Sequence, residues 1–101
     1  MTSFQAQCYK ALQKVPSGKV ITYSGLAKMV GRPKAHRAVG NAMNKNPFAP
    51  QVPCHRVVKS NADLGGFGGG SKLKIKRLRE EGVKVLNNKI VDFESILFKA
   101  H

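Results

Sequence analysis

The chain has 101 residues, enough for one small domain with a single hydrophobic core. It has no apolar run long enough to cross a membrane and no signal-peptide-like N-terminus, so we expect an intracellular protein of the cytoplasm and nucleoid, or of a eukaryotic nucleus. Eighteen Lys and Arg outnumber five Asp and Glu, and no acidic residue precedes Asp63. The charge of +13 is typical of nucleic-acid binders, and a merely solubilising surface is the alternative.

The first predicted helix is capped by Thr2 or Ser3 and runs to about Val15. Its apolar residues recur at helical spacing: Phe4, Cys8, Ala11, Leu12 and Val15. The Pro-Ser-Gly sequence at 16–18 ends it. Because Cys8 lies on this apolar face, we expect it to be an inert core thiol.

Two short helices separated by a tight turn follow. Thr22 is placed to cap a helix over residues 23–30, and Gly31 is a suitable stop. Pro33 suits the first turn of a third helix that extends to about Asn44. Its expected packing stripe is Ala35, Ala38, Val39, Ala42 and Met43, and its expected outward residues are Lys34, Arg37 and Lys45. This is a helix-turn-helix pattern, whose second helix usually enters a DNA groove; a helical hairpin in an ordinary core is the alternative.

A rigid segment then leads into Cys54. Its three prolines, Pro47, Pro50 and Pro53, forbid regular helix. The motif Cys-His-Arg-Val-Val at 54–58 follows directly. The later run GGFGGG at 65–70 cannot form a stable core element, and its glycines allow the backbone to approach a ligand closely.

The last third of the chain supplies a fourth helix and most of the β component. Ser71 is expected to cap a fourth helix that runs to about Glu81 and closes at Gly82. Three segments are expected to be extended, 19–21, 83–86 and 89–93, the last two joined as a hairpin by Asn87-Asn88, and 94–98 is expected to form a terminal helical turn. The sequence therefore predicts one domain over residues 1–101, mostly α with a small β component, of the winged helix-turn-helix-like DNA-binding class.

The chemistry of the chain centres on Cys54. Cysteine is a good nucleophile as a thiolate, and His55 or Arg56 is placed to favour that form. A structural cysteine beside a surface histidine is the alternative, because adjacent residues need not touch. The two cysteines show no CxxC or HxxxH spacing that would suggest a metal site. In an intracellular protein we expect free thiols, and a single disulfide is the alternative. We expect no cofactor.

Several motifs occur in an order that is specific to one family: Gly18–Tyr23, Arg37–Met43, Asn46-Pro47, Pro53–Val57, the glycine-rich loop and Glu81-Gly82. In order and spacing they resemble the O6-alkylguanine-DNA alkyltransferases, also called methylated-DNA–protein-cysteine methyltransferases. The resemblance covers about residues 3–88. It implies single-turnover DNA repair, in which an alkyl group moves from guanine to the protein, and a monomer that binds double-stranded DNA containing O6-alkylguanine through the minor groove.

The resemblance also implies catalytic roles. Cys54 would accept the alkyl group, and His55 would draw off its proton through a water while Glu81 orients the imidazole. Asn46 would brace the active-site turn. Tyr23 would press on the target phosphate and donate toward the guanine ring.

Further implied roles concern the DNA and the base. Arg37 would fill the gap in the stack that the extruded nucleotide leaves. The carbonyls of Cys54 and Val57 would accept from the guanine amino group, and the backbone N–H of Gly68 would face the alkylated oxygen. The implied DNA-contacting residues are Tyr23, Lys34, Arg37, Ala38, Gly40 and Lys45; the implied substrate pocket is formed by Met43, Val57, Phe67 and Gly68.

The sequence departs from the family pattern in three respects. Most members carry an additional N-terminal domain, and we expect none here. The family often has Tyr at the position of Phe67 and Ser at that of Gly68. Two other functions stay open: a non-catalytic alkyltransferase-like protein, which typically has Trp where this chain has Cys54, and a plain winged-helix DNA binder in which Cys54 is structural.

Overall fold

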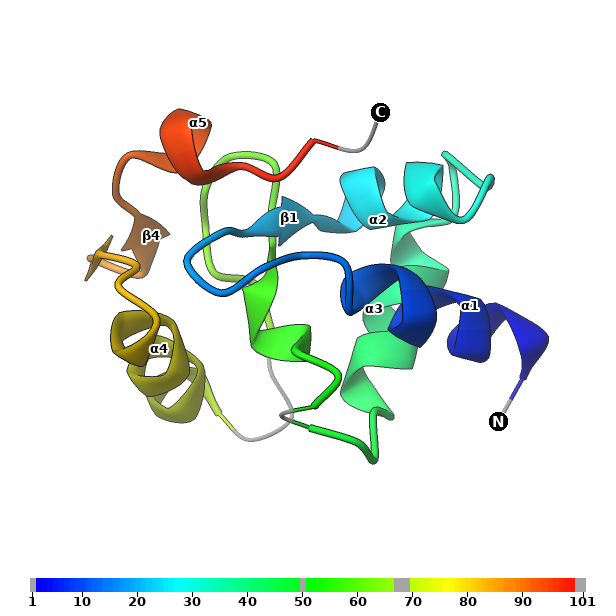
Figure 1. Cartoon of the computed structure of the whole chain (residues 1–101). Helices are drawn as coiled ribbons and strands as arrows, with labels where there is room; N and C mark the ends of the chain where they lie inside the picture. The colour runs from blue at the N-terminus through cyan, green and yellow to red at the C-terminus, as the bar shows by residue number, and fades with distance from the viewer. Residues whose placement is uncertain (1, 50, 67–69, 100–101) are drawn as a thin grey trace.

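The computed structural model describes residues 2–49, 51–66 and 70–99. Three helices build the first half of the chain, α1 (Ser3–Leu12), α2 (Tyr23–Met29) and α3 (His36–Asn44), and they pack against one another (Figure 1). Thr2 caps α1 in a capping box with Gln5, and Thr22 caps α2 through the Gly25 N–H, as predicted. Residue Val15 lies beyond the end of α1, although it is fully buried.

The prediction that Pro33 begins the third helix is wrong. Residues 32–35 form a turn in which the Ala35 N–H donates to the Arg32 carbonyl at 2.9 Å, and α3 begins at His36. Proline suits the second position of such a turn because its φ is fixed and it has no N–H to leave unpaired. The expected packing stripe is also narrower than predicted, because Ala38 is exposed.

A parallel pair of two-residue strands links the halves of the chain. Strand β1 (Ile21–Thr22) pairs with β2 (Val57–Val58), with Ile21 opposite Val57. Helix α2 directly follows β1, and the 3-10 turn η1 (Cys54–Arg56) directly precedes β2. The pairing therefore brings the start of α2 close to Cys54, more than 30 residues away in the chain. The family resemblance implied this proximity, but no local sequence pattern predicted it.

The strands separate two hydrophobic clusters, because successive strand residues point to opposite faces. Ile21 and Val57 pack with the three N-terminal helices. Val20 and Val58 pack with the C-terminal part of the chain, on the side of α4 and the hairpin. The residues next to the strands thus lie at the junction of the two clusters.

The C-terminal part contains α4 (Ser71–Glu80), an antiparallel hairpin of β3 (Val85–Leu86) and β4 (Lys89–Ile90), and the short helix α5 (Phe93–Ile96). The hairpin is confirmed: Asn87 and Asn88 both have positive φ, which a tight two-residue turn requires. Ser71 is not the cap of α4, since the cap position is Gly70 and no side chain caps the helix.

The predicted class is confirmed: a mostly helical, helix-turn-helix-like domain with small β elements. No helix in the described ranges is long and apolar enough to cross a membrane.

Candidate active site around Cys54

Cys54 begins the η1 turn and is a free thiol with only 6% of its surface exposed. Asn46 holds the segment before it: its side-chain amide donates to the Val52 carbonyl at 2.8 Å, and its oxygen accepts from the Phe48 N–H at 2.9 Å. The Cys54 N–H in turn donates to Val52 at 2.9 Å. The two side-chain hydrogen bonds of Asn46 therefore fix the backbone segment that leads to Cys54.

His55 and Arg56 both contact one carboxylate, that of Glu81. Nε2 of His55 lies 3.1 Å from Oε1, close enough for an ion pair but off the line of a good hydrogen bond, and Nδ1 has no partner among the described residues. The Arg56 guanidinium donates to both carboxylate oxygens of Glu81: Nε lies 2.9 Å from Oε1, and Nη2 donates to Oε2. Its Nη1 also donates to the Val15 carbonyl at 2.7 Å, which ties the turn to the end of the first helix.

Burial and charge set the protonation states of this cluster. Burial lowers the pKa of His55, and the Glu81 carboxylate opposes this effect without reversing it. Burial acts to raise the pKa of Glu81, but the contacts with Arg56 and His55 outweigh it and hold that pKa below its usual value. At neutral pH the imidazole is therefore neutral and able to take a proton, while Glu81 is ionised.

Lys74 on α4 has no exposed surface. Its ammonium donates to the carbonyls of Val57 at 2.7 Å, of Gly66 at 3.3 Å and of Leu64. Desolvation lowers the pKa of Lys74 to about 8, against an opposing interaction with Cys54 and Asp63. One side chain therefore joins the strand after Cys54 to the beginning of the glycine-rich loop.

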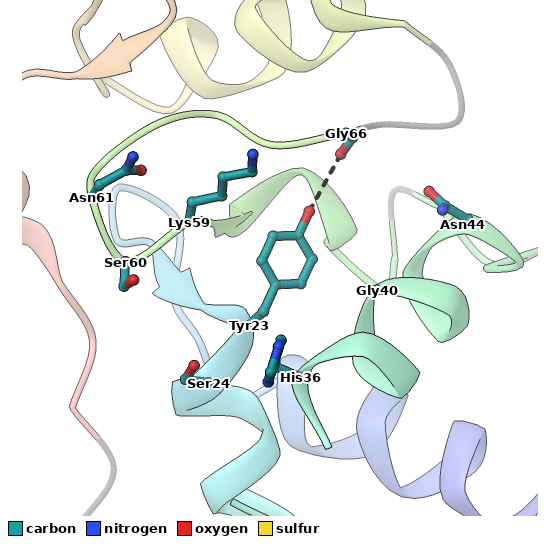
Figure 2. Close-up of a pocket in the computed structure, with 9 residues that line it drawn as sticks. All are labelled: Tyr23, Ser24, His36, Gly40, Asn44, Lys59, Ser60, Asn61 and Gly66. Carbon is teal, nitrogen blue, oxygen red and sulfur yellow. Dashed lines mark hydrogen bonds between the residues drawn. The ribbon is translucent and has the colours of Figure 1, made fainter. Parts of the chain in front are cut away.

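Tyr23 is the first residue of α2, and its ring reaches toward that loop (Figure 2). Its hydroxyl donates to the Gly66 carbonyl at 3.4 Å. Gly65 has φ +73°, and a Cβ there would lie 2.9 Å from the Tyr23 hydroxyl, so the approach requires glycine. Burial, and then the nearby Cys54, raise the pKa of Tyr23, which therefore stays a neutral donor at physiological pH.

Tyr23 stands in a pocket of about 490 Å³ that opens between α3 and the loop after β2. Gly40 lines this pocket and faces the ring, since a Cβ on Gly40 would lie 3.9 Å from Tyr23. Cys54 is not among the lining residues and belongs to the hydrophobic cluster that also contains Met43. The pocket is thus separate from the buried thiol, and Tyr23 is close to Cys54 as well as lining the pocket.

The remaining predicted residues were proposed either for DNA contact or for the substrate pocket. The side chains proposed for DNA contact are exposed on or beside α3: Lys34, Arg37, Ala38 and Lys45. Val57 is fully buried, and its carbonyl is already an acceptor for Lys74. Phe67 and Gly68 lie outside the described residues.

Two residues that matter to the site were not predicted. Arg56 was recognised only as a cation near the thiol, and its bidentate contact with a carboxylate 25 positions away has no local signal. The position of Lys74 could have been predicted from helical spacing: it lies four residues before the buried Leu78 and seven before Glu81, on one helical face. Because lysine is usually exposed, this spacing was not taken as evidence of burial.

Comparison with known proteins shows the family. The chain matches, over residues 3–83, the family described as "6-O-methylguanine DNA methyltransferase, DNA binding domain", and it belongs to that family. A methylated-DNA–protein-cysteine methyltransferase of Methanosarcina acetivorans is 47% identical over 81 residues, which are 80% of this chain and 52% of the relative. The chain spans about half the length of the curated relatives it matches.

Solved structures support the same relationship. Mycobacterium tuberculosis OGT in complex with DNA is similar with a TM-score of 0.78 and 43% identity, over 80% of this chain and 50% of that one. S. pombe Atl1, in complex with damaged DNA containing O6-carboxymethylguanine, is similar with a TM-score of 0.86 and 31% identity, over 99% of this chain and 98% of that one.

Proposed function

We propose that this chain repairs alkylated DNA by transferring the alkyl group from the O6 atom of a guanine to the sulfur of its own Cys54, once per molecule. One observation carries the proposal: a free, buried cysteine begins a turn whose next two residues, His55 and Arg56, both contact Glu81. We assign Cys54 as nucleophile, His55 as base and Glu81 as the orienting carboxylate, the three roles by which proteins activate a thiol. The family and its curated methyltransferase members support the assignment.

The transfer balances as a displacement at the alkyl carbon. The proton of the Cys54 thiol passes to the neutral imidazole of His55 through a water molecule, with Glu81 stabilising the imidazolium. The sulfur then forms a bond to the alkyl carbon while the carbon–oxygen bond breaks, and the electron pair remains on guanine. The thioether is stable and no described side chain is placed to remove it, so the proposal is one turnover per molecule without a cofactor.

The leaving guanine carries negative charge and needs donors and a defined position. Tyr23, held as a neutral phenol close to Cys54, is the donor we assign to the ring. In this proposal the carbonyls of Cys54 and Val57 accept hydrogen bonds from the guanine amino group. The Cys54 carbonyl already accepts from the Val57 N–H, and the Val57 carbonyl accepts from Lys74. A carbonyl oxygen has two lone pairs and can accept a second hydrogen bond. Asn46 keeps the turn that presents these groups in place.

The target oxygen lies inside the base stack, so the nucleotide must leave the duplex before transfer. We assign Arg37, exposed on α3 among Ala38 and Gly40, to the vacated place in the stack. In this proposal α3 lies in the minor groove and the protein acts as a monomer. The exposed lysines Lys34 and Lys45 at the two ends of α3 neutralise phosphates.

The test is the intact mass of the protein after mixing with a duplex that contains one O6-methylguanine. The wild type and a Cys8→Ala variant are each expected to gain one methyl group, on Cys54. Cys54→Ala is expected to gain none, yet still to bind the duplex with an affinity that falls steeply with salt. Turnover beyond one equivalent, or a methyl group on Cys8, would contradict the proposal.

A second candidate function is favoured by the similarity to S. pombe Atl1, which extends over nearly the whole of both chains. In that alternative the domain binds alkylated guanine and marks it for other repair proteins without transfer. Because both functions use the same fold and the same binding step, only the mass measurement separates them. The presence of Cys54 at the acceptor position favours transfer.

A further inference from the structure

Helix α4 carries more basic residues than the helix that we assign to the lesion. Five of its ten residues are Lys or Arg, whereas α3 contains Arg37 and is flanked by Lys34 and Lys45. Neither the transfer reaction nor the placement of α3 on DNA uses the exposed side chains of α4. Three of its basic side chains share the exposed face of the helix, at helical spacing: Lys72, Lys76 and Arg79.

This basic face continues from α4 into the segment before β3. Arg79 lines two neighbouring hollows, one formed by residues of α4 and one that extends to Lys84, which is also exposed. The Arg79 guanidinium donates through Nη2 to the Val85 carbonyl at 3.0 Å, and this contact holds it between the two hollows. We call the four exposed basic residues the α4 surface: Lys72, Lys76, Arg79 and Lys84.

The lysines of the α4 surface have no charge partner within the described part of the chain. Lys72, Lys76 and Lys84 make no hydrogen bond or ion pair there. Among the described residues that line the two hollows, Glu80 is the one carboxylate, and it forms no ion pair with Lys76 one turn before it. The surface therefore presents uncompensated positive charge to the solvent.

The α4 surface faces away from α3. Helix α3 packs through Val39 into one hydrophobic cluster, and α4 packs through Leu78 into the other, on the far side of the strand pair. In Figure 1, η1 and β2 lie between the two helices. Because Leu78 is turned toward the strands, the exposed side chains on the opposite side of α4 point away from α3. A duplex that lies along α3 therefore does not cover the α4 surface.

We propose that the α4 surface binds the phosphate backbone of a second segment of double-stranded DNA while α3 holds the segment with the lesion. The inference goes beyond the proposed function and rests on it for the placement of α3. Charge complementarity supports it, since a row of cations is attracted to the phosphates of DNA. Lys72 and Arg79 lie about 10 Å apart along the helix axis, so they reach different phosphates.

The lining of the two hollows favours a duplex over a single strand. No aromatic side chain is among the described residues that line them, so unpaired bases would have no ring on which to stack. Cations on a helix face without base-reading side chains suit contact with the backbone alone. The second segment is therefore expected to bind without sequence preference and to need no lesion.

The test asks whether one protein molecule holds two duplexes. A short donor-labelled duplex with one O6-methylguanine and an undamaged acceptor-labelled duplex are mixed with Cys54→Ala protein, and energy transfer between the labels reports joint binding. Analytical ultracentrifugation of the same mixture gives the number of protein molecules in the complex. The double variant Lys72→Gln/Lys76→Gln is made in this parent. Its matched control is Lys10→Gln/Lys14→Gln, which removes two exposed lysines with the same spacing at the end of α1.

The parent is expected to bring the two duplexes together in a complex with one protein molecule. Lys72→Gln/Lys76→Gln should weaken capture of the undamaged duplex by about three- to twentyfold, because two exposed ion pairs are lost. It should also lower the slope of log capture affinity against log salt by about two units. Its affinity for the lesion duplex alone should change little, which shows that the variant is folded. The control variant should change neither affinity.

Four results would overturn the second DNA site. The first is no energy transfer with the parent, which would leave the α4 surface to solvent or to an acidic protein. The second is two protein molecules per pair of duplexes. The third is equal weakening of capture by the two double variants, as expected from net charge alone. The fourth is an equal loss of affinity for the lesion duplex by Lys72→Gln/Lys76→Gln, which would mean that both surfaces contact one segment.

Failure of the proposed function has a different signature, because it is the absence of methyl transfer by the wild type to the O6-methylguanine duplex, read from the intact mass. Energy transfer and stoichiometry still decide the second DNA site in that event.

Discussion

Replacement of Lys74 by methionine tests how the buried ammonium supports the active site. Methionine has similar length and fills the space, so the main loss is of the donors to the Val57, Leu64 and Gly66 carbonyls. Hydrogen bonds to a charged group contribute about 2 kcal/mol each. Against this stands the cost of taking the charge out of water, about several kcal/mol, and this burial lowers the pKa of Lys74 to about 8. The net expected loss of unfolding free energy is about 1–3 kcal/mol at pH 7.

The pH dependence gives the sharper result. Between pH 8 and 10.5 the unfolded chain still holds the Lys74 proton that the folded chain has released. The unfolded state then binds more protons, so this lysine makes stability increase with pH over that window. Lys74→Met lacks the contribution, and the stability difference between wild type and variant should widen from pH 7 to pH 9.5. All other titrating groups are common to both proteins.

The assay is urea unfolding at both pH values, with Lys72→Met as the matched control. Lys72 is exposed on the same helix, and its replacement should change stability by no more than about 0.5 kcal/mol. Parallel pH profiles for wild type and Lys74→Met would show that the buried amine does not titrate in this window, and a loss equal to that of Lys72→Met would refute the role of the three carbonyl contacts.

Three further predictions follow from the site. Burial lowers the pKa of His55 below 6.5, so the contribution of this histidine to stability is present above pH 6.5 and is lost as the pH falls through the pKa of the folded state. His55→Gln should therefore reduce the loss of stability below pH 6.5 in a pH series of urea unfolding. An unchanged pH dependence would contradict the burial effect. Gly65→Ala should slow methyl transfer more than Gly31→Ala, since both residues have positive φ but only Gly65 approaches Tyr23; equal rates in a single-turnover assay would exclude that contact as the cause. Arg37→Ala should slow transfer from duplex DNA by the equivalent of a few kcal/mol and leave transfer from free O6-benzylguanine nearly unchanged, and equal losses on the two substrates would rule out the stack-filling role.

The elements that the sequence predicted well depend on local chemistry. Thr2 and Thr22 satisfy N–H groups at helix starts, and the Asn87-Asn88 pair adopts the positive φ that a tight hairpin needs. Pro33 misled because proline suits a turn as well as a first helical turn, and only the tertiary path decides between them. Sequence patterns of three or four residues therefore predicted the structure correctly only where they are compatible with a single local structure.

The parts that the sequence did not predict depend on distant partners. The β1–β2 pair is two residues long on each strand, too short for an alternating pattern, yet it places Tyr23 near Cys54. Lys74 looks like a surface residue by type and becomes a buried one because three carbonyls of the Val57–Gly66 segment converge on its ammonium. The proximity of His55 and Glu81 was expected through the family resemblance alone, and Arg56 joined them only in three dimensions.

The two candidate functions share the features of the fold that serve DNA binding. An exposed basic helix, a pocket without acidic residues and a domain similar along its whole length to a protein solved with damaged DNA serve binding and transfer equally. Binding alone, however, gives no use to a buried histidine directly after a cysteine on a turn that Asn46 holds. Burying a histidine whose Nδ1 has no partner among the described residues costs folding free energy, and in the proposed transfer this side chain receives the proton of Cys54.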